Sequence, residues 1–155
     1  MAKRKRYQES TDIKRIISSW SKLSKLQSRK SWSLTIIQAT ATVEIAEDLV
    51  IRKELQSRCG LDAVFVNHLL EWANGIIGKM DNLILPLFSR SKQFTRFKMQ
   101  KRLIEKINEN RNAIIQRCKL CSEREAATVI NRAKIVIESL VKIYRPEFNL
   151  DDGQK

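Results

Sequence analysis

The sequence predicts an all-α fold, an up-and-down helical bundle of about five main helices. Good helix formers dominate the 155 residues, and only four glycines and two prolines interrupt them. Apolar residues recur three and four positions apart along most of the chain, which is the spacing of one helix face. This length is typical of one domain with its own core. We therefore expect a single domain over residues 1–155, with a flexible basic arm at 1–9 and a frayed tail at 146–155.

The first two predicted helices differ in how far their apolar surface extends. The first begins at Ser10 or Thr11 and has one apolar stripe opposite a basic face. The second runs from Ser31, its expected N-cap, to about Arg58, and Gly60 is the expected left-handed residue that ends it. Because apolar residues cover most of its circumference, we expect this helix at the centre of the bundle.

Two acids interrupt the apolar surface of the second helix. Glu44 and Asp48 are four residues apart on one of its stripes, and inward-facing acids need cationic partners. Arg111 is the candidate cation, and the resulting ion pair would either support the structure or orient a site. Paired helical carboxylates also occur in metal sites, but those usually add carboxylates or a histidine. Simple exposure of both acids is the third possibility. We expect no metal and no cofactor.

The middle of the chain predicts a third helix at residues 62–78 and a short apolar segment at 83–88. The segment is expected to end or kink at Pro86, and its exposed side to serve a partner chain. The lone histidine, His68, is more typical of a packing or surface residue than of a catalyst. The expected core set of the third helix is Leu61, Val64, Phe65, Leu69, Trp72, Ala73 and Ile76.

A long helix is predicted to run to about Gln116, and a last helix to cover residues 123–144. Residues 90–102 hold six basic side chains and no acid, with Phe94 and Phe97 between them. Cations with aromatics are typical of single-stranded nucleic-acid binding, although core packing explains the phenylalanines more simply. The last helix begins at a capping box of Ser122 and Glu125 and stops before Pro146.

Net charge indicates the class of partner. A charge of +13 favours a polyanion, with nucleic acid first and an acidic membrane surface second. No apolar run approaches the ~20 residues that span a membrane. Three cysteines without an export signal favour the cytoplasm. The cations expected to contact RNA are Lys14, Arg15, Lys22, Lys25, Arg90, Lys92, Arg96, Lys98 and Arg117.

Few sequence motifs suggest chemistry. The chain has no glycine-rich phosphate loop, zinc-protease motif or nucleophile elbow. Cys118 and Cys121 have zinc-knuckle spacing, but no second pair follows them. Arg111 is more informative, because it is placed on the apolar stripe of the fourth long helix, among Ile104, Ile107, Ile114 and Ile115. A guanidinium facing inward there suggests a site.

The segment from Arg111 to Gln116 is Arg-Asn-Ala-Ile-Ile-Gln, and a polar link and the Ser122-capped helix follow it. This arrangement resembles the HEPN superfamily of small all-helical domains, best over residues 103–145, and within it the branch whose motif begins Arg-Asn. Glu44 inside the apolar second helix is a softer similarity. The resemblance implies a homodimer, paired near the fourth helix, whose two motifs form one RNA-cleaving groove that needs no metal.

Gln116 stands where the resemblance implies a histidine. Imidazole can transfer a proton near pH 7, whereas an amide can only hydrogen-bond. The resemblance implies that Arg111 holds the scissile phosphate of the RNA and that Asn112 is an orienting polar partner. Gln116 would occupy the position of the general acid or base. We expect an RNA-binding relative of toxin or defence endoribonucleases with impaired cleavage, and an antitoxin or another protein as a possible partner. Both a natural inactive relative and a replaced histidine remain open. The alternative is a non-enzymatic basic bundle that binds nucleic acid or acts as an adaptor.

Overall fold

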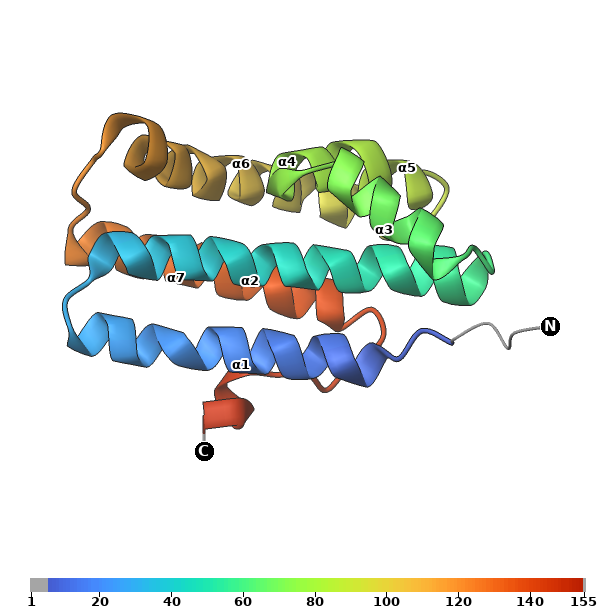
Figure 1. Cartoon of the computed structure of the whole chain (residues 1–155), viewed down its shortest axis with the longest axis horizontal. Helices are drawn as coiled ribbons and strands as arrows, with labels where there is room; N and C mark the ends of the chain where they lie inside the picture. The colour runs from blue at the N-terminus through green and yellow to red at the C-terminus, as the bar shows by residue number, and fades with distance from the viewer. Residues whose placement is uncertain (1–5, 155) are drawn as a thin grey trace.

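The computed structural model describes residues 6–154, which form an all-α bundle without strands, as predicted (Figure 1). An antiparallel pair of helices, α1 (Glu9–Ser28) and α2 (Trp32–Arg52), opens the chain. A second antiparallel pair, α6 (Phe94–Arg117) and α7 (Glu123–Val141), closes it. Shorter segments connect the pairs: η1 (Lys53–Arg58), α3 (Ala63–Trp72), α4 (Gly75–Lys79), η2 (Met80–Ile84) and α5 (Leu85–Leu87). No helix among the described residues is long and apolar enough to cross a membrane.

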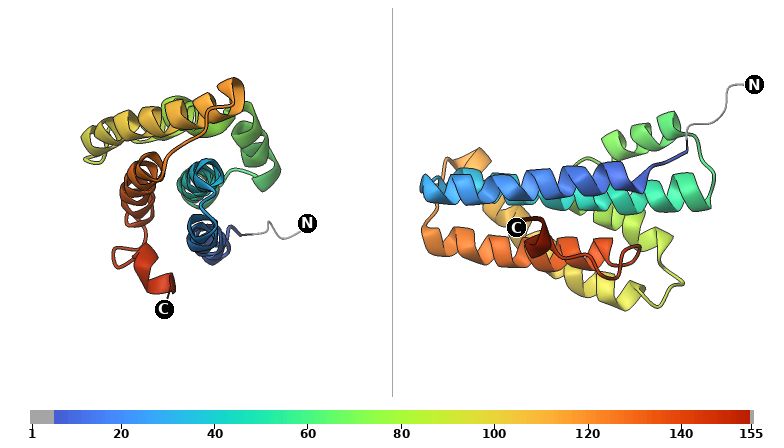
Figure 2. Two further views of the ribbon diagram at one scale, coloured as in Figure 1. Left: turned by 90° about the vertical axis from the view of Figure 1, so that its left-hand side faces the viewer. Right: turned by 90° about the horizontal axis from the view of Figure 1, so that it is seen from below.

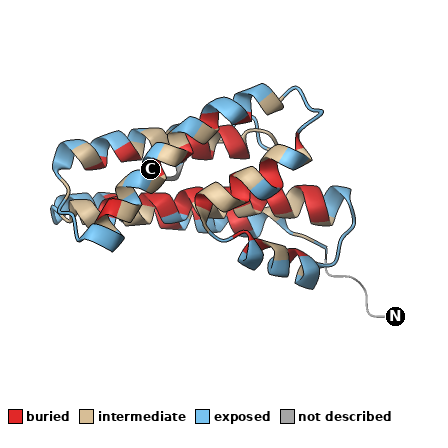
Figure 3. Ribbon diagram, turned by 90° about the horizontal axis from the view of Figure 1, so that it is seen from above, coloured by how far each residue is buried: buried red, intermediate tan, exposed pale blue. Residues whose placement is uncertain are grey.

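The α2 helix lies at the centre of the bundle, as its apolar circumference predicts. It packs against α1, α7, α6 and α4 (Figure 2), and buried residues gather on the facing sides of the helices (Figure 3). Ser31 is its N-cap, but its side chain makes no capping hydrogen bond. The π-helical turn η1 extends α2 by six residues, and Gly60 follows with a φ of +68°. Glycine favours this left-handed geometry because it has no Cβ.

The predicted third helix is wrong in both continuity and orientation. It is broken after Trp72, and Gly75 begins α4 with a φ of +84°. Val66 and Leu70 of α3 face the core, whereas four members of the expected core set, Leu61, Val64, Phe65 and Trp72, are exposed. The reason is that α3 is apolar on two faces and lies at the edge of the bundle. Periodicity alone then cannot select the face that packs.

The apolar segment at 83–88 belongs to the core of the protomer. Leu83, Ile84 and Phe88 are buried, and only Pro86 is exposed. The continuous helical run of residues 75–87 ends one residue after Pro86, close to where the proline is predicted to end or kink it, and the π-helical turn η2 directly precedes α5. The expectation that this segment serves a partner chain therefore loses its basis.

The phenylalanines of the basic stretch are explained by packing. Phe97 is buried and meets Phe88 edge to face, with ring centroids 4.8 Å apart. Phe94 is half-buried, and the Lys98 ammonium lies 5.2 Å from its ring. Both rings are thus engaged within the protomer, which supports the core interpretation over base stacking.

The C-terminal tail packs against the bundle. A short 3-10 helix, η3 (Leu150–Gln154), contacts α1. The side chain of Leu150 is buried, and its backbone N–H donates to Glu138 Oε1 at 3.1 Å. The expectation of a frayed tail is therefore wrong through residue 152. Residues 1–5 of the expected basic arm, and residue 155, lie outside the described residues.

Candidate functional site

Arg111 continues the apolar stripe of Ile104 and Ile107 on α6, as its spacing predicts, but its side chain is exposed and does not face the core. Ile104 and Ile107 are buried, but beyond them only Ala113 of α6 is buried. Ile115, which the periodicity also placed on the stripe, is 50% exposed. Ile114 of the same stripe is half-buried and packs against the core. The last turns of α6 are therefore only partly covered by the rest of the bundle.

Arg111 nevertheless lines a cavity, and Glu44 lines it too. This Arg111 cavity has a volume of about 270 Å³, and α2, α4 and α6 enclose it. Thr40 and Glu44 come from α2, and Asn108 and Arg111 from α6. Residues 75–78 of α4 complete the wall, with Asn74 before them. The structure thus brings together two of the predicted site residues. The half-buried Asn112 and the exposed Gln116 do not line this cavity.

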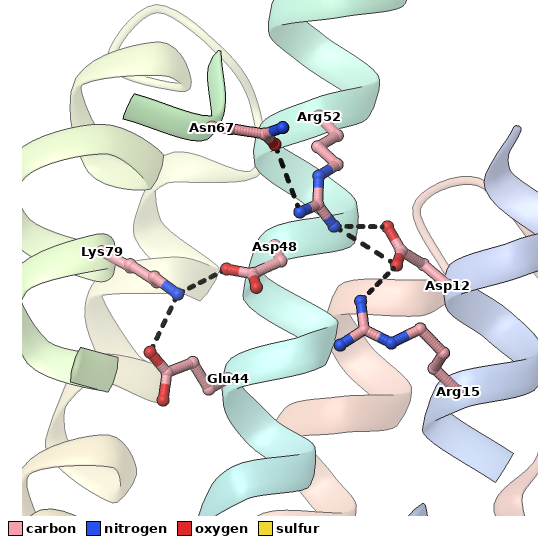
Figure 4. A network of polar contacts seen from close by, with 7 residues as sticks. All are labelled: Asp12, Arg15, Glu44, Asp48, Arg52, Asn67 and Lys79. Carbon is pink, nitrogen blue, oxygen red and sulfur yellow. Dashed lines mark hydrogen bonds and ion pairs between the residues drawn. The ribbon is translucent and has the colours of Figure 1, made fainter. Parts of the chain in front are cut away.

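The cation that pairs with the two acids is Lys79, and the prediction of Arg111 in this role is wrong. Lys79 Nζ lies 2.8 Å from Glu44 Oε1 and 2.6 Å from Asp48 Oδ1 (Figure 4). A lysine side chain is rarely buried without such partners, and Lys79 is only 5% exposed. One sequence signal pointed to it, since Lys79 is the only lysine or arginine between Arg58 and Arg90.

A third acid of α2, Glu47, lies beside this ion pair, and the sequence pattern did not predict it as part of the site. Glu47 is fully buried, and neither of its carboxyl oxygens has a hydrogen-bond partner among the described residues. Burial raises the pKa of Glu47 well above the usual range, and the Lys79 charge opposes this only in part. Burial also raises the pKa of Asp48, against its hydrogen bond to Lys79. We infer that Glu47 is buried as the neutral acid.

Lys79 remains a cation inside this cluster. Burial by itself lowers the pKa of Lys79, but hydrogen bonds to Asp48 and Glu44 outweigh it, so the pKa is raised. Among the residues that the structure describes, no group of three or more His, Cys, Asp or Glu side chains is arranged to hold a metal ion. The Lys79 network consists of Lys79, Glu44 and Asp48. Glu44 lines the Arg111 cavity, whereas Lys79 and Asp48 line a separate cavity of about 370 Å³.

The cations predicted to contact RNA are exposed, but they do not form one surface. One group lies on α1 and the other on and before α6, and α2 separates these two helices (Figures 1 and 2). The first group is Lys14, Arg15, Lys22 and Lys25. The second is Arg90, Lys92, Arg96, Lys98 and, at the far end of α6, Arg117.

The Arg111 cavity presents one guanidinium and one carboxylate but offers no imidazole for proton transfer. His68 is exposed on α3 and does not line it. The capping box at the start of α7 has formed, with the Glu125 N–H donating to Ser122 Oγ at 3.1 Å.

Comparison of the chain with protein-family models, with curated proteins and with solved structures finds no match.

Proposed function

We propose that this protein binds RNA and that the Arg111 cavity is a phosphate-contacting site of the HEPN type without a general base. The observation that carries the proposal is that Arg111 and Glu44, far apart in the chain and on different helices, line one cavity. These are two of the residues on which the family resemblance rests. A guanidinium presents several donors in a plane and binds phosphate oxygens in pairs.

Charge supports RNA as the polyanion. The net charge of +13 provides attraction that does not depend on sequence, and each neutralised phosphate releases counterions. Because the exposed cations are divided between α1 and α6, we expect an RNA strand to contact more than one side of the bundle. Affinity should therefore fall steeply as the salt concentration rises.

Cleavage is expected to be weak or absent in the chain as it stands. An amide at position 116 has no pKa near neutrality, so it cannot take the proton of a ribose hydroxyl. Glu44 does not replace it, since its carboxylate is committed to Lys79 at 2.8 Å. Loss of acid–base chemistry typically costs a factor on the order of 10² to 10⁴ in rate.

A homodimer would bring a second copy of α6 to the motif. The end of the bundle that carries Gln116 has exposed apolar side chains, Ile115 and Leu120 from the α6–α7 region and Leu34 from α2. The start of α2 adjoins the α6–α7 link, because the Cys121 N–H donates to Ser33 Oγ at 3.2 Å. Such a patch is typical of a protein interface. If the dimer forms here, Leu120→Glu should shift the protein to monomer in sedimentation velocity.

The test of the enzymatic part is Gln116→His. This variant should cleave labelled RNA faster than the parent protein, with little change in affinity and no effect of EDTA, because no metal activates the nucleophile. Arg111→Ala in that background should abolish cleavage. Thr95→His, an exposed site at the other end of α6, is the matched control and should stay inactive. A folded, dimeric Gln116→His protein that cuts no RNA would overturn the HEPN assignment.

An adaptor function is the second candidate, and the outer face of α3 favours it. Val64, Phe65 and Trp72 are exposed by 52% or more, and they occur at helical spacing. Exposed apolar stripes of this kind often bind other proteins. Failure of the protein to bind RNA even at low salt would favour this function.

A further inference from the structure

A second and larger cavity lies further along α2, beside the start of α1. It has a volume of about 530 Å³, and we call it the arginine cavity because Arg6, Arg15 and Arg52 line it. The acid in its wall is Asp12. The cavity lies between the first turns of α1, the end of α2 and the start of α3, away from Arg111.

Asp12 anchors two of these arginines. Its side chain is only 4% exposed, and it accepts hydrogen bonds from Arg52 at 3.1 Å and from Arg15 at 3.3 Å (Figure 4). It also accepts from the Tyr7 hydroxyl at 2.7 Å. Burial and this bond raise the pKa of Tyr7 far above neutrality, so the phenol remains a donor. One buried carboxylate thus holds two guanidinium groups in place at the cavity wall.

The arginines keep donors that the protein does not use. Arg15 binds Asp12 through one terminal nitrogen, and its side chain is 55% exposed. The second terminal nitrogen of Arg52 reaches Asn67 Oδ1 only at 3.5 Å. Arg6 has no hydrogen-bond or ion-pair partner among the described contacts. Three guanidinium groups against one carboxylate leave an excess of two positive charges in this cavity.

The Arg111 cavity lacks this excess. Arg111 and Glu44 are its only charged residues, and their charges balance. A multiply charged anion is therefore attracted more strongly to the arginine cavity. The orientation imposed by Asp12 adds to the effect, because less side-chain freedom is lost when a ligand binds.

We propose that the arginine cavity binds the terminal phosphate monoester of a nucleotide, either as a free mononucleotide or as the 5′ end of an RNA chain. A phosphate monoester carries about −1.5 to −2 charges at neutral pH and three acceptor oxygens, which matches the charge excess. An internal phosphodiester carries one negative charge and matches it less well. The volume lies within the usual range for small-molecule sites, about 300–1,000 Å³. The amides of Gln56 and Asn67 in the wall can hydrogen-bond the sugar or base.

The direct test compares ligands that differ only in the terminal phosphate. Binding of a short RNA with a 5′-phosphate and of the same RNA with a 5′-hydroxyl is measured by fluorescence anisotropy, and AMP and adenosine are compared by calorimetry. We expect the phosphorylated RNA to bind at least about tenfold more tightly, the change that one or two charge-assisted hydrogen bonds give. If AMP also binds and adenosine does not, free mononucleotides are ligands. Phosphate-dependent binding of RNA alone assigns the site to RNA 5′ ends.

Variants distinguish a built site from diffuse basic charge. Arg15→Gln should remove the preference for the 5′-phosphate, whereas Arg102→Gln, the same change at an exposed residue of α6, should leave it. Asp12→Asn makes the cavity more positive but releases Arg15 and Arg52. The preference should therefore fall in a built site, and binding should rise if only net charge matters. Circular dichroism checks that each variant is folded. If Asp12→Asn unfolds, Arg15→Gln still tests the preference for the 5′-phosphate, because Arg15 is exposed and its replacement should leave the fold intact.

The proposal is overturned if the two RNAs bind equally and AMP does not bind. Equal losses in Arg15→Gln and Arg102→Gln, or tighter binding by Asp12→Asn, would also overturn it. These outcomes are separate from the proposed RNA function. The RNA with a 5′-hydroxyl lacks the terminal phosphate, so its affinity measures binding by the basic surfaces alone. Conversely, Arg111→Ala should leave the 5′-phosphate preference unchanged.

Discussion

Two polar networks on α2 use neighbouring positions of one helix face and have opposite compositions (Figure 4). Glu44, Asp48 and Arg52 follow each other four residues apart. In the Lys79 network, one buried cation lies between the first two, which are acids. In the Asp12 network, one buried acid lies between Arg52 and Arg15.

The difference shows that the neighbouring helix decides what a polar position on α2 does. The end of α4 supplies a lysine whose two ion pairs are to Glu44 and Asp48, so its charge is neutralised within the protein, although Lys79 and Asp48 line a cavity of about 370 Å³. The first turn of α1 supplies an aspartate that orients arginines without using all their donors, so the Asp12 network stays open. We therefore expect substitutions in the first network to change mainly stability, and those in the second to change mainly binding.

The largest loss of stability should follow Lys79→Met. This change leaves Glu44 and Asp48 without their cation next to the buried Glu47, and breaking a buried ion pair typically costs about 3–5 kcal/mol. Urea unfolding at neutral pH measures the loss. Lys101→Met is the control, because Lys101 pairs with Asp81 at 3.0 Å and its side chain is 36% exposed, against 6% for Lys79, so this change should have a smaller effect. Similar losses for the two variants would contradict the assignment of Lys79 to a buried network.

Asp12→Asn should destabilise the protein less, by about 1.5–3 kcal/mol, the usual contribution of a hydrogen bond to a charged group. The released cations are less buried than Lys79, since the side chain of Arg52 is 20% exposed and that of Arg15 is 55% exposed. Both can therefore turn to water. Unfolding under the same conditions tests the ranking, and a loss larger than that of Lys79→Met would reverse the comparison.

Glu47→Gln should instead stabilise the protein near neutral pH, by an amount on the order of 1–2 kcal/mol. The folded-state pKa of Glu47 is raised above its ordinary value of 4.5, so the native protein binds more protons than the unfolded chain above that pH. Stability then falls as the pH rises through this window. Because glutamine cannot ionise, the gain should shrink as the pH approaches 4.5. Unfolding curves across this pH range test it, and a gain independent of pH would argue against a neutral Glu47.

The smallest change in stability should follow Arg15→Gln, within about 0.5 kcal/mol, as is usual for exposed ion pairs. Its bond to Asp12 is an i, i+3 contact at 3.3 Å, and more than half of its side chain faces solvent. Thermal unfolding of this variant measures the change. If its stability is unchanged, a loss of phosphate binding can be assigned to the arginine cavity and not to unfolding. A loss of more than about 1 kcal/mol would show that Arg15 supports the fold as well as the arginine cavity.

The sequence by itself determined the elements whose signals are local. The all-α class, the central position of α2, the glycine that ends its extension and the capping box of α7 were all predicted correctly. A cap depends on residues three positions apart, and a helix that is apolar all round can only be covered on all sides. These properties do not depend on how the helices are rotated against each other.

Only the tertiary structure decided which faces meet. It turned Val66 rather than Phe65 of α3 toward the core, left Arg111 exposed and gave Glu44 and Asp48 the distant Lys79 as a partner. It also assembled the arginine cavity from three separate helical segments. The physical reason is that ion pairs and cavities depend on helix rotation and crossing. Those are determined by the packing of the whole core, and no short stretch of the chain encodes them.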